Sequence, residues 1–458
     1  MERIQESHSA LWYGLADIQC AFYRVLLLQW LIPYFAAPPV LASALMSDSE
    51  LAAGGFSDVF SHRWIRASDL VYPACTRLPM GWSHAVAVML HIGTRRAFRA
   101  LINESKFLSL NVPSSDVAPL TLAPDQVAGG LFVDNLLVFG EDEQSVNTAL
   151  RGAVGDLNDS GLTVGEVAWA SQEAVYVGLE LTQHGMTPKP HQLAMLYNTT
   201  KYFASFQKLS GKVLQRVMGF YSWFCSLERL LFSLAGASYI FTAEAGDSWL
   251  PLWPSVKKEL NQVADMLPLV RTFWAWERSP FVVAQDAEGP NSYDHGGCGV
   301  VVRSVSAQDW DWAVKSFPRI PRPLLPSEED FISVCAWEEV SAIRWFYREH
   351  INLGELEAII EWVKQIVGRF SLPTSGSTSE FFEAFAPLRI LAFSDNHVVV
   401  GATSKGRSSS FWLRARLKKL AALLIRGNIR LVVVWIPTGF MPADSASRRR
   451  PSHSFKQD

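Results

Sequence analysis

The stretch LFVDNLLVFG, residues 131–140, places one acidic step between two short apolar runs. Apolar runs of this length that contain Val, Phe and Leu are typical of buried strands, so the stretch predicts a hairpin that turns at Asp134 and Asn135. A carboxylate at such a turn costs free energy to bury without a partner, and a metal cation is a common partner. A plain Asp-Asn turn is the alternative interpretation of this stretch taken alone.

The composition around this stretch bounds the possible classes of protein. A chain of 458 residues with 49% hydrophobic residues and a mean hydropathy of +0.11 is long enough for two to four domains. No uninterrupted apolar run reaches 18 residues, so we expect no membrane span. The five cysteines lie far apart without a CxxC pair, which argues against a zinc site or a disulfide framework and predicts an intracellular protein, with cytoplasm or nucleus left open.

The charge of the chain is uneven. A net charge of −3 and a pI near 6.4 count mildly against a nucleic-acid partner. The stretch from Lys405 to Arg430, however, carries eight basic residues and no acidic one. This stretch is either a solvated helix face or a face that contacts phosphates, and the sequence leaves both open.

Upstream of the hairpin, two further motifs occur in a fixed order. The apolar stretch from Leu11 to Leu28 reads as a strand that enters a turn or helix, with Asp17 at the end of the strand and Phe22 five residues later. The segment LPMGWSHA, residues 78–85, follows as a turn that leads into an apolar helix, and it contains Met80 and Gly81. Downstream of the hairpin, a helix is expected over residues 143–160, followed by strands up to Leu181.

In this order, the motifs DIQCAF, LPMG and FVDN resemble those of the palm of retroelement reverse transcriptases, and the resemblance covers about residues 11–235. It implies an RNA-directed DNA polymerase in which Asp17 and Asp134 hold two Mg²⁺ (or Mn²⁺) ions. It also implies that Phe22 acts as a steric gate against a ribose 2′-hydroxyl and that Met80 and Gly81 lie beside the incoming nucleotide. Core packing is the alternative role of Phe22 and Met80.

The chain departs from this family at three places. Asn135 stands where the family has a second aspartate, so the site has one negative charge fewer. The lysine expected after GLTV is absent, and Glu166 lies near that position. Only 16 residues precede Asp17, so most of the fingers subdomain is missing and we expect an N-terminally truncated element with missing polyprotein segments. The polymerase half is therefore expected to be impaired.

Two segments link the halves. Residues 201–224 have apolar residues at helical spacing with interleaved basic residues, which predicts one amphipathic helix similar to the thumb of the family. An ordinary core helix is the alternative. Residues 236–278 are rich in Trp and Pro and are expected to form a connector.

In the second half, acidic residues again follow apolar runs. Residues 281–286 form a predicted strand that ends at Asp286, with residues 296–302 as its hairpin partner and residues 310–315 as a possible third strand. A helix is expected over residues 351–370, a strand before Asp395, a helix over residues 411–425 and a last strand over residues 431–435. The final acidic residue of this set is Asp444, in PAD.

The sequence of strand-Asp, helix-Glu, strand-Asp and Pro-Ala-Asp resembles the ribonuclease H fused behind reverse transcriptases, over about residues 279–450. The resemblance implies a two-metal site with Asp286 and Asp395 as central ligands, completed by Glu355 and Asp444. Glu338, Glu339 and Glu357 are rivals of Glu355, but the match to INxxEL favours Glu355. The resemblance also implies that the basic stretch, including Lys405 and Arg407, contacts the backbone of a hybrid by its shape.

The resulting hypothesis is a multidomain chain of α+β and α/β type, with a ferredoxin-like palm, a thumb and a ribonuclease H-like mixed sheet. Its domains are a partial palm (1–188), a thumb-like region (189–235), a connector (236–278), a ribonuclease H-like domain (279–450) and a tail (451–458). Its partners are an RNA template, a DNA primer, an RNA–DNA hybrid and deoxynucleotide triphosphates, without a membrane. The resemblance implies an LTR- or DIRS-like retrotransposon. The alternative is a catalytically degenerate retroelement relic that at most binds nucleic acid.

Overall fold

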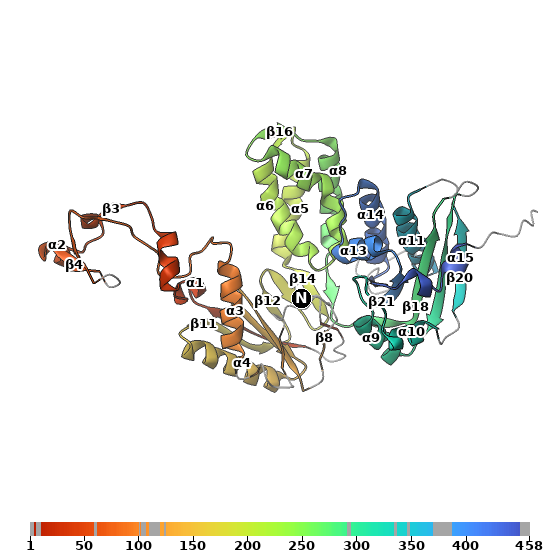
Figure 1. The fold of residues 1–458 in the computed structure, drawn as a ribbon, viewed down its shortest axis with the longest axis horizontal. Helices are drawn as coiled ribbons and strands as arrows, with labels where there is room; N and C mark the ends of the chain where they lie inside the picture. Colours follow the sequence, from red (N-terminus) through yellow and green to blue (C-terminus); the bar gives the residue numbers. More distant parts are fainter. Residues whose placement is uncertain are drawn as a thin grey trace, which may run out of the picture. The chain divides into compact units, whose positions relative to one another are not determined.

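The computed structural model describes residues 4–5, 11–58, 62–99, 101, 107–109, 120–122, 125–290, 295–333, 337–345, 349–369 and 387–448. The chain divides into two compact units, which are coloured along the sequence in Figure 1. The N-terminal unit comprises Trp12–Val112 and Pro124–Ser171, and the C-terminal unit comprises Met1–Leu11, Pro113–Ala123 and Gln172–Asp458. The expectation of a mixed α and β chain with more than one domain is confirmed.

The N-terminal unit is built on a five-stranded sheet in the order β11-β2-β10-β9-β7. Its strands are β2 (Trp12–Ile18), β7 (Phe107–Ser109), β9 (Val127–Phe132), β10 (Asn135–Gly140) and β11 (Val164–Ser171). The predicted hairpin is present as β9 and β10, but its turn residues are Val133 and Asp134 rather than Asp134 and Asn135, because Asn135 pairs with Phe132 as the first residue of β10. Strand β10 also pairs with β2, so that Asn135 stands opposite Asp17. Helices α3 (Ala85–Ala97) and α4 (Glu143–Asp159) contact each other and bury the apolar side chains of the sheet.

Short elements fill the chain between β2 and α3. They are α1 (Ala21–Arg24), η1 (Gln29–Phe35), β3 (Val40–Leu41), η2 (Ala42–Ala44), α2 (Asp48–Ala52), β4 (Gly55–Ser57), β5 (Trp64–Arg66) and β6 (Leu70–Val71). The pairs β3–β6 and β4–β5 each form a two-stranded ribbon. Trp30 and Tyr34 of η1 are largely exposed, so this segment has little core of its own.

The C-terminal unit begins with a small sheet and a group of helices. The sheet has the order β12-β13-β14-β17, and its strands are β12 (Ala174–Tyr176), β13 (Leu179–Leu181), β14 (Gly185–Pro188) and β17 (Thr272–Phe273). The helices are α5 (Pro190–Ala204), α6 (Gly211–Cys225), η3 (Arg229–Ala235), α7 (Gly236–Ala245), α8 (Pro254–Met266) and η4 (Leu267–Leu269). A further pair, β1 (Ile4–Gln5) and β8 (Leu120–Thr121), is parallel.

The prediction of one helix over residues 201–224 is wrong. Helix α5 ends at Ala204, and α6 begins only at Gly211. Between them, β15 (Lys208–Ser210) pairs with β16 (Trp249–Pro251), so Leu209 lies opposite Leu250. The apolar spacing continues across this break because Leu209 is buried in the short strand rather than on a helix face.

The second large sheet has the order β20-β19-β18-β21-β22. Its strands are β18 (Glu277–Glu288), β19 (Gly297–Ser304), β20 (Glu338–Arg344), β21 (Leu388–Ser394) and β22 (Ile429–Trp435). Strands β18, β19 and β20 are antiparallel neighbours, whereas β21 is parallel to both β18 and β22. The carboxyl ends of β18 and β21 therefore lie at the same edge, which is where Asp286 and Asp395 are placed.

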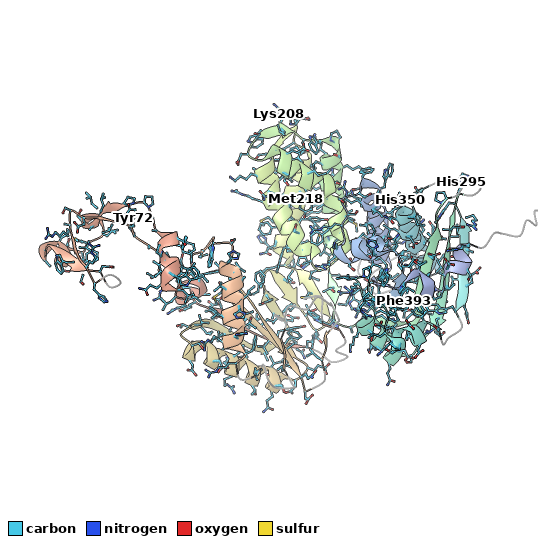
Figure 2. The ribbon with its side chains drawn as sticks, viewed as in Figure 1. Tyr72, Lys208, Met218, His295, His350 and Phe393 are labelled. Atoms are coloured by element: carbon cyan, nitrogen blue, oxygen red, sulfur yellow. The ribbon has the colours of Figure 1, made fainter. Side chains whose placement is uncertain are left out.

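Helices cover both faces of this sheet. They are α9 (Ala307–Ser316), α10 (Pro326–Ser333), α11 (Ile351–Arg369), α13 (His397–Lys405), α14 (Phe411–Arg426), η5 (Thr438–Phe440) and α15 (Asp444–Ser447). One buried cluster joins the sheet to α11, α13 and α14. The other joins it to α9 and α10 and contains Phe393, which is labelled in Figure 2 and packs against Phe317.

The predicted third strand over residues 310–315 is wrong, because these residues lie in α9. The Ser306 side chain caps this helix by accepting a hydrogen bond from the backbone N–H of Asp309. Trp310, Ala313 and Val314 are buried at helical spacing. The third strand of the sheet is β20, which follows the proline-rich segment and α10.

Candidate active site

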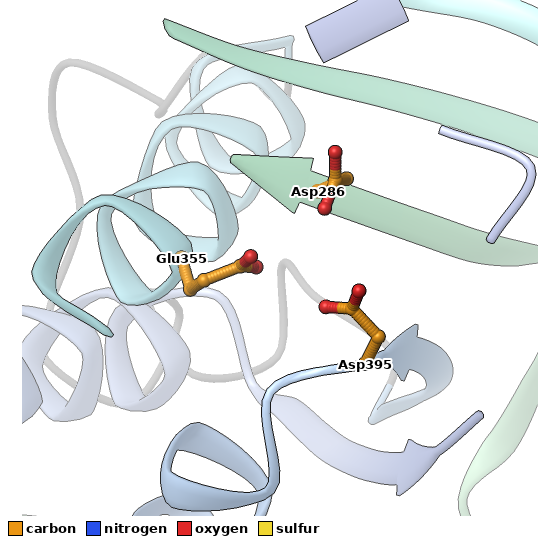
Figure 3. A group of neighbouring side chains, drawn as sticks. All are labelled: Asp286, Glu355 and Asp395. Atoms are coloured by element: carbon orange, nitrogen blue, oxygen red, sulfur yellow. The ribbon is translucent and has the colours of Figure 1, made fainter. Parts of the chain in front are cut away.

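Three carboxyl groups from separate elements meet at the edge of the second large sheet. Asp286 lies near the end of β18, Glu355 on the first half of α11 and Asp395 directly after β21. One oxygen of each lies within 4.8 Å of the others, and Figure 3 shows the three side chains pointing toward one another. The structure thus brings together three of the four acids that the sequence assigned to a second metal site.

Glu355 is the most deeply buried of the three. Its side chain is 2% exposed, and its Oε1 accepts a hydrogen bond of 3.2 Å from the backbone N–H of Ala287. Its Oε2 is buried without a hydrogen-bond partner among the described residues. Burial, and then the charges of Asp286 and Asp395, raise the pKa of Glu355 well above its ordinary value.

Asp286 is held in place by a residue that the sequence analysis did not single out. The buried Ser447 hydroxyl donates a hydrogen bond to Asp286 Oδ2. Burial raises the pKa of Asp286 to about 6, the Ser447 hydrogen bond opposes this rise, and the charges of Asp395 and Asp444 add to it. The sequence offered one indication of this contact: Ser447 follows Asp444 by three residues, so on a helix the two side chains would lie on the same face.

The Asp395 side chain does not cap the helix that follows β21, because its neighbour does. Asn396, not Asp395, caps α13, since its side-chain oxygen accepts hydrogen bonds from the N–H groups of Val398 (3.0 Å) and Val399 (3.2 Å). The Asn396 amide also donates to Asn352 Oδ1 at 2.8 Å, which ties α13 to the start of α11. The backbone oxygen of Asp395 accepts a 2.9 Å hydrogen bond from the indole of Trp435.

Asp444 lies beside the three carboxyl groups and has a basic partner. Its Oδ1 is 2.6 Å from a guanidinium nitrogen of Arg448, four residues later. Asp444 and Arg448 line the same cavity of about 360 Å³ as the three carboxyl groups, together with Asn352 and His397. The rival acid Glu357 points elsewhere, because its carboxylate forms a 3.0 Å ion pair with Arg416 of α14.

The donor set fits divalent metal ions. Three carboxyl groups within 4.8 Å repel one another when ionised, and a buried carboxylate oxygen without a partner costs free energy. A hard cation such as Mg²⁺ or Mn²⁺ removes both costs, since it binds carboxylate oxygens. The cluster offers no sulfur or imidazole ligand, which disfavours zinc.

In the N-terminal unit, the two predicted acids also lie close together. Asp17 stands in register with Asn135, and the backbone N–H of Ile18 donates to the carbonyl of Asp134 at 2.9 Å. Burial, and then the charges of Asp134 and Glu166, raise the pKa of Asp17. The amide of Asn135, the residue that stands where the resembled family has a second aspartate, donates a hydrogen bond to Asp134 Oδ1 at 2.8 Å. One carboxylate oxygen of Asp134 is therefore already hydrogen-bonded.

Glu166 is a third acid beside Asp17 that the sequence analysis did not assign. It lies on β11, in the irregular part of the pairing between Val164–Ile18 and Val167–Ala16. The sequence offered one indication of this position: the apolar and polar residues of GLTVGEV alternate as in a strand, which places Glu166 on a strand that follows the hairpin. The bulge decides which residues of β11 stand opposite Asp17, and a bulge is not visible in the sequence pattern.

The predicted nucleotide-contacting residues differ in their surroundings. Phe22 of α1 is half-buried and packs against the core of the N-terminal unit, in agreement with the packing alternative. Met80 is 64% exposed, and Gly81 has a φ of +94° with open space around it. The turn that holds them is tied to α1, because the N–H of Leu78 donates to the carbonyl of Val25. Their roles toward a nucleotide stay predictions.

The basic stretch from Lys405 to Arg430 is divided between two roles. Lys405 and Arg407 are exposed. Arg416 instead pairs with Glu357, and Lys418 pairs with Glu259 at 3.3 Å. Part of the stretch therefore joins α14 to its neighbours, and the expectation that all of it faces a hybrid backbone is too broad.

Comparisons with known proteins give a remote structural likeness. No family model and no curated protein matches the chain. The chain is similar to three solved structures of the foamy viral protease-reverse transcriptase. The TM-score is 0.39 and the sequence identity 10% for its dRH form in complex with double-stranded DNA. For a complex with an RNA/DNA hybrid the TM-score is 0.38 and the identity 11%, and for another complex with double-stranded DNA they are 0.37 and 12%.

These likenesses extend over most of this chain. They cover 94%, 97% and 95% of it, and 58%, 68% and 69% of the respective viral chains. The chain thus spans little more than half the length of the first of these structures. At such low identity and TM-score, the chemistry has to be argued from the carboxyl groups themselves. No helix among the described residues is long and apolar enough to cross a membrane.

Proposed function

We propose that the C-terminal sheet carries a metal-dependent nuclease that hydrolyses the RNA strand of an RNA–DNA hybrid. One observation carries the proposal: Asp286, Glu355 and Asp395 converge within 4.8 Å, with a buried Glu355 oxygen that has no partner among the described residues. The order of the strands, in which β21 adds in parallel to an antiparallel β18-β19-β20 set, supports the resemblance to ribonuclease H. The Asp286–Glu355–Asp395–Asp444 order of the sequence supports it as well.

Asp286, Glu355 and Asp395 would hold divalent cations, and Asp444 would complete the site. When bound, the cations supply an activated water and stabilise negative charge on the phosphodiester. In the metal-free protein, burial and the neighbouring carboxylates raise the pKa of Asp286 to about 6 and the pKa of Glu355 well above its ordinary value, so cations compete with protons for both groups. Cation binding and cleavage should therefore weaken as the pH falls through about 6, the pKa of Asp286 in the metal-free protein.

The residues around the acids would orient the site and its substrate. Ser447 fixes the rotamer of Asp286, and the Asn396–Asn352 hydrogen bond fixes the segment that carries Asp395. Arg448 lines the cavity and pairs with Asp444, and its guanidinium group would attract an approaching phosphodiester. Lys405 and Arg407 are exposed cations on the same unit and are proposed to contact the hybrid backbone.

The direct test is cleavage of a labelled RNA–DNA hybrid by the full chain in Mg²⁺ or Mn²⁺. Asp286→Asn should lower the cleavage rate at least about 100-fold, because it removes a metal ligand rather than a neighbour of one. Asp330→Asn is the matched control, since Asp330 is an exposed acid on α10 of the same unit. Equal cleavage by the parent and Asp286→Asn would refute the assignment of the site.

RNA-directed DNA polymerisation is a second candidate function, favoured by the adjacency of Asp17 on β2 and Asp134 in the turn before β10. Its substrates would be a primer-template and deoxynucleotide triphosphates. Asn135 weakens this candidate, because an amide is a neutral ligand and here bonds to Asp134. Primer extension that is lost in Asp134→Ala would support polymerase activity. If the parent chain neither cleaves the hybrid nor extends the primer, the remaining hypothesis is a degenerate relic that at most binds nucleic acid.

A further inference from the structure

The start of α14 presents two aromatic side chains to solvent. Phe411 and Trp412 are the first two residues of this helix, and each is 63% exposed. Their rings pack against each other in a T-shaped arrangement, with ring centroids 5.3 Å apart. A single exposed apolar side chain is common on a protein surface, whereas adjacent exposed rings form a contiguous patch, and such patches are typical of binding surfaces.

The fold of α14 does not depend on these two rings. The helix packs into the core through Leu413, Leu417 and Leu420. Its N-terminus is capped by Ser410, whose hydroxyl accepts a 3.4 Å hydrogen bond from the backbone N–H of Leu413. Polar side chains at positions 411 and 412 would serve the helix equally well and would expose less apolar area to water. The two rings therefore call for a role in binding.

Two exposed cations precede the rings on the same loop. Lys405 is the last residue of α13, and Arg407 follows the glycine that ends this helix. Neither side chain forms an ion pair or a hydrogen bond with the part of the chain that the structure describes. No acidic residue occurs from Lys405 to Arg430, so the loop attracts anions. Together, Lys405, Arg407, Phe411 and Trp412 form the loop platform.

The loop platform stands on a packed base and is separate from the carboxylate cavity. Gly406 lies against the backbone of Arg229 in η3, and the side chain of Arg414 lies against Gly236, the first residue of α7. None of the platform residues lines the carboxylate cavity. Helix α13, which is about 13 Å long, separates the platform from Asp395. A ligand therefore meets a preorganised surface, which lowers the entropic cost of binding.

We propose that the loop platform binds single-stranded nucleic acid. Unpaired bases stack on aromatic rings with little regard to sequence, and cations beside the rings attract the phosphates. A hybrid backbone at Lys405 and Arg407 leaves the rings unused, because the bases of a duplex are already paired and stacked. An acidic peptide fits the cations but not the rings, and an apolar protein surface fits the rings but not the cations. The inference does not depend on the proposed nuclease, because this binding needs none of the clustered carboxyl groups.

The test is fluorescence anisotropy of a labelled oligothymidylate titrated with the full chain in a chelator, which removes the cations that cleavage would need. We expect saturable binding that is about tenfold weaker in Phe411→Ala and in Trp412→Ala, since each variant removes a ring on which a base stacks. Trp412→Phe keeps a ring and should bind like the parent, whereas Trp412→Leu should be as weak as Trp412→Ala. Ile320→Ala is the control, because Ile320 is an aliphatic residue that is 69% exposed in the loop between α9 and α10.

A strand without bases separates stacking from charge. An abasic strand of the same length should bind the parent about tenfold more weakly than oligothymidylate, and its affinity should not change in Trp412→Ala. Arg407→Gln should weaken the binding of both strands and lower the slope of log K against log salt concentration by about 0.7. A blunt RNA–DNA hybrid should likewise respond to Arg407→Gln but not to the loss of either ring.

Three results would overturn the proposal: no binding of oligothymidylate by the parent, equal binding of the abasic strand and oligothymidylate, or unchanged binding in Phe411→Ala and Trp412→Ala. Parent-like binding by Trp412→Leu would also overturn it, because the ring would then act only as apolar area. Both rings are exposed, so the variants should unfold at the same urea concentration as the parent, and a lost affinity then reports on the surface. A failure of the separate hybrid-cleavage assay would leave these outcomes unchanged.

Discussion

At the scale of single residues, Asp286 combines a proposed role as a metal ligand with a cost in stability. Its side chain is 6% exposed, and its pKa rises from 3.8 to about 6, mainly because of burial. A carboxyl group with a raised pKa stabilises the folded state only while it is protonated. The stabilisation is complete below about pH 4 and is lost as the pH rises through about 6.

Asp286→Asn should therefore make the metal-free protein more stable at pH 8. The shift of about two pKa units corresponds to roughly 3 kcal/mol, which is an upper bound on the gain in the free energy of unfolding. The gain should vanish at pH 4, where the aspartate is protonated. Urea unfolding in a chelator at the two pH values measures it, with Asp330→Asn as the control. A variant less stable than the parent at pH 8 would contradict the burial argument.

Ser447 should act on the reaction through Asp286. Ser447→Ala removes a hydrogen bond to the carboxylate, so the pKa of Asp286 should rise further. We expect hybrid cleavage at pH 7 to fall about tenfold and the acid limb of its pH profile to move to higher pH. The measurement is the rate of cleavage from pH 5 to pH 9. A lower cleavage rate whose acid limb stays at the same pH would show that Ser447 acts through packing and not through the pKa of Asp286.

At the scale of elements, the end of α13 depends on one glycine. Gly406 has a φ of +66° and lies so close to η3 that a Cβ would be 1.8 Å from the carbonyl oxygen of Arg229. Only glycine meets both demands at low cost. This contact positions Lys405 and Arg407 and joins α13 to η3.

Gly406→Ala should destabilise the C-terminal unit by at least about 2 kcal/mol, from the backbone strain alone. Gly401→Ala is the matched control, because Gly401 lies inside the same helix with open space around it and a negative φ. It should stabilise the unit by about 0.5–1 kcal/mol through helix propensity. Urea unfolding followed by tryptophan fluorescence measures both changes. Equal effects of the two substitutions would contradict this account of α13.

Helices and strands whose apolar residues recur with one clear period were predictable from the sequence. The runs LFVDNLLVFG and FVVAQD were predicted as strands and lie in β9, β10 and β18, and INLGELEA was predicted as a helix and begins α11 at Ile351. The segment DWDW, residues 309–312, alternates like a strand, yet the Ser306 cap and the burial of Trp310 with Ala313 make it a helix. Leu209 pairs with Leu250, about forty residues away, which local periodicity does not encode.

The acids of the site were predictable, but their environment was not. The ends of apolar strands pointed to Asp286 and Asp395, and the match of INLGEL to the INxxEL motif of the resembled family pointed to Glu355 rather than Glu357. The hydrogen bond of Ser447, the pairing of Asp444 with Arg448 and the approach of Glu166 to Asp17 depend on how separate elements pack. Packing of this kind follows from the three-dimensional fold rather than from spacing along the chain.

At the scale of the whole molecule, each of the two units holds its own acidic site. Asp17 and Asp134 lie in the N-terminal unit, whereas Asp286, Glu355 and Asp395 lie in the C-terminal unit. The two proposed activities can therefore be separated by mutation. The domain boundaries expected from the sequence stay a prediction, although the segment 236–278 holds α7 and α8, which pack with α5 and α6.

The central claim is that Asp286, Glu355 and Asp395 bind a divalent cation. The most direct measurement is titration of Mn²⁺ followed by the loss of its free electron paramagnetic resonance signal, with Asp17→Asn and Asp134→Asn already introduced so that the Asp17–Asp134 pair is removed. We predict saturable Mn²⁺ binding at pH 8 that Asp286→Asn and Glu355→Gln each abolish, while Asp330→Asn retains it. Mn²⁺ binding that persists unchanged in Asp286→Asn and Glu355→Gln would contradict the account.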